Sequence, residues 1–112
     1  MPNPANIDDR NVSLGNFGIS PEVTVVTEAT TLKPHETNVQ VITNGDGNYN
    51  ITLPNPAECL NRLVRVVMVE FDTDTATLLN PDGTDRGMDA VDEHVLLFSD
   101  GRIWIELDES VT

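Results

Sequence analysis

The residues with side chains suited to chemistry are few, and their spacing matches no familiar catalytic or metal site. His35 and His94 lie far apart, and neither has the cysteine, histidine or glutamate spacing that zinc sites use. No serine stands in the strained elbow typical of hydrolases. No glycine cluster precedes a predicted helix, as a phosphate-binding loop would. We therefore expect a protein that is not an enzyme and that holds no metal or cofactor.

Two acidic clusters need a closer look, one at Asp72 and Asp74 and one at Asp82 and Asp85. Calcium takes about six to eight oxygen ligands, and the glutamate that closes its usual loop is missing from both clusters. Aspartate and glycine are also the residues that tight turns require. Turns are therefore the favoured interpretation, and bound calcium is the alternative.

Three further side chains are notable because of their type or place. Cys59 is the only cysteine, so the chain has no intramolecular disulfide, and we expect Cys59 to be a small buried hydrophobe. Arg65 lies on an otherwise apolar strand face and is expected to pair with a carboxylate, within the subunit or across an interface. Trp104 is expected in the core or at an interface, where aromatic residues are enriched.

Charge and length limit the classes of partner. The chain has 112 residues, which suits one domain, and its formal net charge is −13, from 19 acidic and 6 basic residues. Such a surface repels nucleic acid and anionic membranes, and it favours solubility and basic or cationic partners. The N-terminus lacks the basic and apolar regions of a signal peptide. The longest strongly apolar run, Val66 to Val69, is far too short to span a bilayer.

The clearest element lies at Val39 to Leu53. Apolar and polar residues alternate on both sides of the turn pairs Asn44-Gly45 and Asp46-Gly47, which tolerate positive φ. This pattern predicts a β-hairpin.

Further strands are predicted by the same alternation. The longest, Leu63 to Phe71, is apolar on both faces, so we expect a central or interface strand. Other strands are predicted over residues 22–29, 75–79, 94–99 and 102–107, turns at 80–83 and 100–101, either one helical turn or a tight crossover at 57–61, and connections at 30–36 and 84–93. These elements predict an all-β fold: a small antiparallel β-sandwich or β-barrel-like domain of about seven strands, spanning residues 21–112.

Residues 1–20 differ from the rest and are predicted to form an extended N-terminal arm. They contain proline, asparagine and glycine with scattered apolar residues, and three interpretations compete: a disordered tail, an arm folded back on its own domain, or an arm docked on another subunit. Disordered segments are poor in apolar residues, so the docked arm is favoured. The residues predicted to bind a partner are Ile7, Val12, Leu14, Phe17 and Ile19.

From Thr43 onward the chain resembles a module that recurs in virion proteins of tailed bacteriophages. The likeness is carried by Asn50 to Pro54, Val64 to Phe71, Thr75 to Thr84, and Val95 to Gly101 followed by Trp104. In that family these are successive strands of small β domains, often trimeric, found on head decorations, head fibres and tail fibres. The resemblance implies a virion structural protein and a homo-oligomer, with a trimer favoured and a dimer possible.

A compact acidic body with one arm is the anatomy of a capsid decoration, or cement, protein. We therefore expect a protein made in the host cytoplasm that binds the major capsid protein on the outer surface of the phage head and stabilises it, with neither nucleic acid nor membrane as partner. The alternative is a host-recognition module of a tail or head fibre that binds glycans, for which Tyr49 and Trp104 are the candidate stacking residues. An enzyme acting on polysaccharide would need paired carboxylates in a cleft, and no pair stands out.

Overall fold

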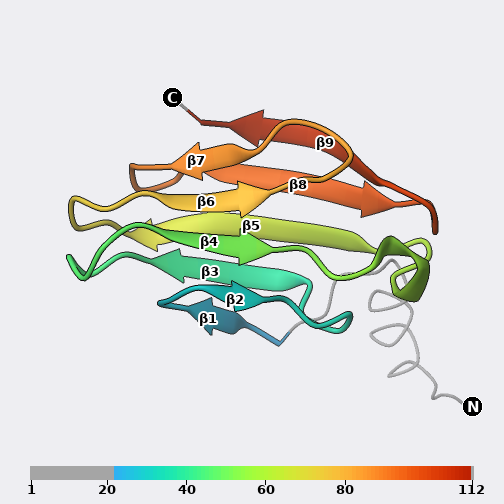
Figure 1. Ribbon diagram of the computed structural model, residues 1–112, viewed down its shortest axis with the longest axis horizontal. Coiled ribbons are helices and arrows are strands. Elements are labelled where there is room, and N and C mark those ends of the chain that lie inside the picture. The colour runs from blue at the N-terminus through green and yellow to red at the C-terminus, as the bar shows by residue number, and fades with distance from the viewer. Residues whose placement is uncertain (1–21, 112) are drawn as a thin grey trace, which may run out of the picture.

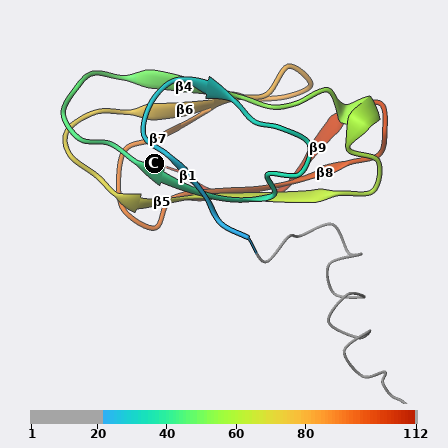
Figure 2. The same cartoon turned by 90° about the horizontal axis from the view of Figure 1, so that it is seen from below.

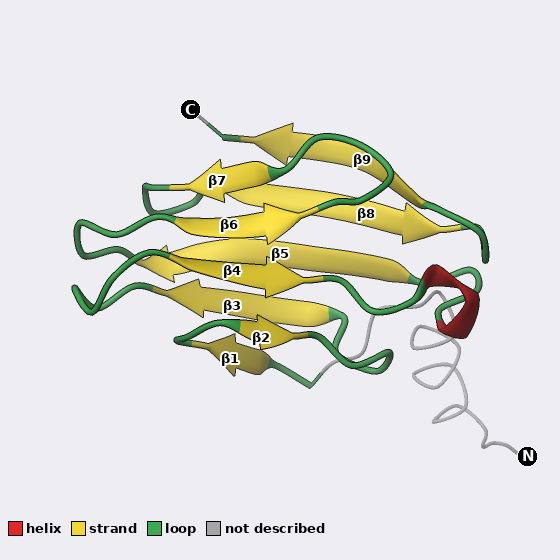
Figure 3. Cartoon of the chain, viewed as in Figure 1, coloured by secondary structure: helices red, strands yellow, loops and turns green. Residues whose placement is uncertain are grey.

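A computed structural model describes residues 22–111 as an all-β protein, which confirms the predicted fold class. Within this range it has nine strands and one 3₁₀ turn (Figures 1 and 3). They are β1 (Thr24–Val26), β2 (Thr30–Thr31), β3 (Asn38–Ile42), β4 (Tyr49–Thr52), η1 (Pro56–Glu58), β5 (Leu63–Glu70), β6 (Ala76–Leu79), β7 (Arg86–Met88), β8 (His94–Ser99) and β9 (Trp104–Ser110). The predicted arm at residues 1–20 lies outside the described range.

The strands form two sheets that face each other as two layers (Figure 2). One sheet has five strands in the order β1-β3-β5-β8-β9, and the other has four in the order β2-β4-β6-β7. The core lies between the sheets and is built mainly from Val, Leu and Ile, with Met68, Met88 and Trp104. Each fully buried side chain of this size contributes roughly 1.5–3 kcal/mol of transfer free energy.

The chain alternates between the two sheets from β1 to β6. As a result, β1, β3 and β5 run parallel in one sheet, and β2, β4 and β6 run parallel in the other. These six strands make three stacked coils of two strands each, as in a short β-solenoid. The antiparallel strands β7, β8 and β9 then complete the two sheets.

The predicted hairpin at Val39 to Leu53 is wrong. Both strands exist, but β3 and β4 belong to different sheets, and residues 43–48 form an arch that crosses from one layer to the other. Val39 and Val41 of β3 and Ile51 of β4 all point into the same interior from opposite sides. An alternating strand buries one face in either arrangement, so alternation predicts a strand but not the strand beside it.

The predicted antiparallel arrangement is therefore correct only for part of each sheet, and about seven strands was too few. The two strands that were missed are β2, which has two residues, and β7, which runs through Arg86-Gly87-Met88. Neither is long enough to show an alternating pattern. Residues 22–111 form two open sheets and no closed barrel.

Several other predictions are confirmed. β5 is the central strand of the five-stranded sheet, and β8 and β9 form an antiparallel hairpin. The turn at 80–83 is present, with the Gly83 amide donating to the Asn80 carbonyl at 3.2 Å. The helical turn is η1, where the Asn55 side chain accepts from the Ala57 amide and so caps the turn. The last strand begins at Trp104 rather than Arg102.

Candidate functional site

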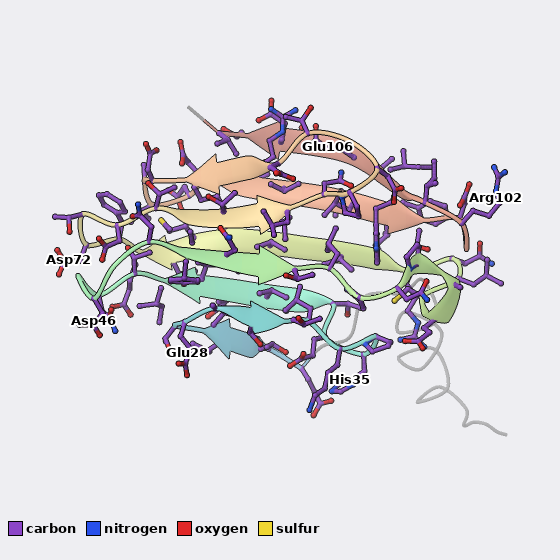
Figure 4. All side chains as sticks on the ribbon, in the orientation of Figure 1. Glu28, His35, Asp46, Asp72, Arg102 and Glu106 are labelled. Carbon is purple, nitrogen blue, oxygen red and sulfur yellow. The ribbon has the colours of Figure 1, made fainter. Side chains whose placement is uncertain are left out.

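The first acidic cluster serves the stacking of two arches. Residues 43–48 and 71–75 both cross between the sheets, and they are joined by hydrogen bonds from the Gly47 amide to Asp74 Oδ2 at 2.9 Å and from the Thr75 amide to Asn48 Oδ1 at 2.8 Å. The Asp72 amide donates to Thr43 Oγ1 at 2.9 Å. Figure 4 shows Asp46 and Asp72 together at this end of the sandwich, with Arg102 at the opposite end.

The carboxylates of the second acidic cluster also accept hydrogen bonds from backbone amides. Asp82 Oδ2 accepts from the Trp104 amide at 2.9 Å, which ties the turn to the start of β9, and Asp85 Oδ1 accepts from the Asn80 amide at 2.7 Å. Across residues 22–111, no three acidic, histidine or cysteine side chains converge as metal ligands would. The geometry of both clusters therefore agrees with turns.

The two aromatic residues considered for sugar stacking both donate hydrogen bonds to backbone carbonyls of the same chain. Trp104 is 1% exposed, and its indole Nε1 donates to the Pro54 carbonyl at 2.8 Å. The Tyr49 hydroxyl donates to the Ile42 carbonyl at 2.6 Å and lies 3.2 Å from the Val26 carbonyl. Burial raises the pKa of the Tyr49 phenol. Trp104 therefore has no exposed ring for a glycan, and Tyr49 is half-buried with its hydroxyl engaged.

Cys59 is buried, as predicted, and burial raises the pKa of its thiol above the usual value, so the reactive thiolate is disfavoured. The two histidines are not brought together as a site. His35 lies in the connection between β2 and β3 (Figure 4), whereas His94 opens β8 on the outer surface of the five-stranded sheet.

The outer faces of the two sheets differ sharply in composition. On the four-stranded sheet, the outward residues of β4 and β6 are Asn50, Thr52, Thr77 and Leu79, and most of them are polar. On the five-stranded sheet, the outward residues of β5 and β8 are mostly apolar, apart from Arg65 and His94, whereas those of β3 include Asn38 and Gln40. The outward apolar residues there are Val25, Leu63, Val67, Val69, Leu96, Phe98 and Ile105, which we call the apolar face.

The apolar face is organised in rows across β5, β8 and β9. Leu63 lies opposite Phe98, and Phe98 lies opposite Ile105. In the next row Arg65 lies opposite Leu96, and Leu96 lies opposite Asp108. Apolar residues gathered on one sheet face in this way are typical of an interaction surface.

A shallow depression of about 460 Å³ lies on this face, lined by residues of β5, β8 and β9 together with Asp92. Its polar groups centre on His94. The ring Nδ1 lies 3.1 Å from the Asp92 carbonyl, and Nε2 lies 3.2 Å from Asp108 Oδ2. The hydrogen bond to the Asp92 carbonyl, followed by that to Asp108, raises the pKa of His94, while nearby Arg65 opposes the rise. Both ring nitrogens face acceptors, and only the imidazolium can donate from both.

The expected pairing of Arg65 with a carboxylate is not found within residues 22–111. Its guanidinium meets the Asn38 side-chain oxygen at 3.4 Å and makes no ion pair with any described residue. Arg65 and Asp108 lie two strands apart in the same row, with Leu96 between them. The expected pairing across an interface stays a prediction.

An ion pair joins the two sheets at the edge where β7 and β9 lie. Arg86 and Glu106 both lie opposite interior residues, and they form a two-pronged ion pair with both contacts at 2.8 Å. The hydrogen bonds that Arg86 donates to the Glu106 carboxylate raise the pKa of Arg86 further above its usual value. Charged groups at a sheet edge also discourage unwanted strand pairing.

Sequence reasoning identified only part of this surface. It noted that Leu63 to Phe71 is apolar on both faces, but it did not single out Leu96 and Phe98. The run Val95-Leu96-Leu97-Phe98 carried the same signal, since it too lacks polar residues on either face. The predicted binding residues Ile7, Val12, Leu14, Phe17 and Ile19 lie outside the described residues.

No family model, curated protein or solved structure matches this chain. Among the described residues, there is no helix with the length and apolar character needed to cross a membrane.

Proposed function

We propose that this chain is a bacteriophage virion structural protein, specifically a capsid decoration protein that binds the outer surface of the assembled head and stabilises it. The observation that carries the proposal is the contrast between the two sheet faces: one is polar, and the other is an apolar face without a covering element in residues 22–111. This is the construction of a protein that acts by binding. The resemblance of residues 43–104 to virion β domains supports the same class.

The proposed mechanism is thermodynamic. A protein that binds the assembled shell but not its separated subunits stabilises the shell by mass action. Many bound copies would then oppose internal pressure without any chemical step. The net charge of −13 suits the outside of a shell better than a surface that faces DNA.

In this proposal the arm at residues 1–20 contacts the major capsid protein through Ile7, Val12, Leu14, Phe17 and Ile19. The test is co-sedimentation of the purified protein with DNA-free expanded heads and, separately, with isolated tails. We expect saturable binding to heads alone and a higher melting temperature of the decorated heads. Binding to tails or to host cells, with none to heads, would instead support the fibre module.

Deletion of residues 1–20 tests the role of the arm. We expect the shortened protein to keep the melting transition of its β domain and to lose binding to heads. A matched control replaces Ile7, Leu14 and Phe17 by serine in the full-length chain, which keeps the length of the arm and removes its apolar contacts. Head binding as tight as that of the intact chain in both variants would contradict the proposed role.

The glycan-binding alternative has less support than head binding. Of its two candidate stacking residues, Trp104 is buried, and Tyr49 is half-buried with its hydroxyl bonded to the Ile42 carbonyl.

A further inference from the structure

We propose that the apolar face of the five-stranded sheet binds a second copy of this chain, in a face-to-face dimer whose twofold axis runs along β8. In this arrangement a second copy covers the apolar face, head binding is left to the arm at residues 1–20, and the dimer is tested without heads. It rests on the order of residues across β5, β8 and β9 and on the placement of one cation and one anion in that order.

The rows of the apolar face are arranged symmetrically about β8. β5 and β9 are its two neighbours, each about 4.8 Å away. A rotation of 180° about an axis along β8, in the plane of contact, exchanges the positions of β5 and β9. Leu96 and Phe98 then each meet the same residue of the second copy, and Leu63 meets Ile105.

The same rotation pairs the charges. Arg65 and Asp108 lie on opposite sides of Leu96 in one row, so Arg65 of each copy faces Asp108 of the other. Packed sheets lie about 10 Å apart, a gap that an arginine and an aspartate side chain together can bridge. Aligned sheets cross at about 30°, which displaces these neighbouring positions by only a few ångströms.

This arrangement accounts for a cation that has no ion pair within residues 22–111. Arg65 lies between Asn38 and Leu96, and its guanidinium makes a 3.4 Å contact to the Asn38 side chain. In the dimer it gains Asp108, whose other neighbour, His94, contacts only Oδ2. Each copy carries a net charge of −13, so contact through a face that includes one of the few cations limits repulsion.

The contact area is small. A twofold axis along β8 lays only β5, β8 and β9 over their counterparts, because β9 is the last strand of the sheet. β5 has eight residues, which gives a length of roughly 26 Å, and three strands span roughly 14 Å, so the flat contact area is roughly 360 Å². A standard interface buries about 800 Å² on each partner, so we expect a weak, reversible dimer.

The test exchanges the charges between two variants. Arg65→Asp sets two carboxylates opposite each other in its own dimer, and Asp108→Arg sets two cations opposite each other. We expect each variant alone to dimerise at least about tenfold more weakly than the wild type. An equimolar mixture of the two should dimerise again, because both contacts in the mixed dimer join opposite charges. Sedimentation equilibrium over a concentration series measures all three.

Matched controls carry the same charge changes elsewhere. Arg102→Asp alters an exposed cation in the loop between β8 and β9, and Asp46→Arg alters an arch residue at the other end of the sandwich. Both should dimerise as the wild type does. The proposal is overturned if the wild type stays monomeric or forms a trimer, if Arg65→Asp dimerises normally, or if the mixture fails to restore the dimer.

A second measurement covers the case in which a charge variant does not fold. In a Cys59→Ser background, Leu96→Cys places a thiol next to its counterpart across the proposed axis, and Thr77→Cys places one on the polar outer face of the other sheet. A short bismaleimide should join two copies of the Leu96→Cys variant and leave the Thr77→Cys variant as single chains. Equal joining of both, or joining of Thr77→Cys alone, contradicts the proposed face.

Discussion

Individual polar side chains join the two sheets at their edges. Tyr49 extends from β4 to the Ile42 carbonyl at the end of β3, and Trp104 of β9 donates to the Pro54 carbonyl just after β4. Both bonds join segments of different sheets. Removal of either donor leaves a carbonyl without its partner, which is more costly than the loss of a solvated bond.

We expect Tyr49→Phe to lower the free energy of unfolding by about 1–2 kcal/mol, because the substitution removes only the hydroxyl and leaves the Ile42 carbonyl unpaired. Urea denaturation followed by circular dichroism measures the change. Thr77→Val is the matched control, since it removes a hydroxyl from the outer face of β6. Equal free energies of unfolding for Tyr49→Phe and wild type would show that this hydrogen bond makes no net contribution to stability.

His94 makes stability depend on pH in a defined direction. Its pKa is raised in the folded state by the Asp92 carbonyl and Asp108, against the opposing effect of Arg65. The stabilisation is therefore fully present below the unfolded pKa of about 6.5 and is lost as pH rises through the folded pKa. We expect the difference in unfolding free energy between wild type and His94→Gln to be larger at acidic than at alkaline pH. A difference that grows with pH would contradict this sign.

At the level of elements, the stacked arches hold the coils in register. Residues 43–48 and 71–75 carry no hydrophobic core, so side-chain hydrogen bonds between them fix their relative position. Gly45 and Gly47 have φ of +87° and +123°, values that other residues adopt at a cost. The glycines that suggested a hairpin turn thus serve an arch instead.

We expect Asp74→Ala and Asn48→Ala each to lower the free energy of unfolding by about 0.5–1 kcal/mol. This is the lower part of the usual range for a hydrogen bond, because both bonds are exposed to solvent. The double variant should lose less than the sum, since both bonds join the same two arches. Asp46→Ala is the control, because its carboxylate accepts no hydrogen bond within residues 22–111. Fully additive losses would show that the two bonds act independently.

At the level of the whole molecule, strong negative charge opposes a fold with a modest core. Self-repulsion of a chain at −13 destabilises the compact state, and dissolved salt screens it. We expect the melting temperature to rise as sodium chloride is increased from low to physiological concentration, measured at a protein concentration low enough to keep the chain monomeric. A melting temperature that falls with salt would show that favourable ion pairs such as Arg86–Glu106 outweigh the repulsion.

The sequence by itself determined the all-β class, the position of most strands, the buried Cys59 and the central place of β5. These follow from local properties: side-chain alternation, β-branched residues and turn chemistry act within a few residues of the chain. The sequence also showed that Leu63 to Phe71 is apolar on both faces.

Only the tertiary structure decided which strands lie side by side. Alternation is the same for a hairpin and for an arch between sheets, so Val39 to Leu53 was consistent with either, and the choice depends on contacts with β5 and β6 far along the chain. The placement of Arg65, Leu96 and Asp108 in one row depends likewise on the register of three strands. Long-range pairing creates that surface, because no local pattern fixes the register between distant segments.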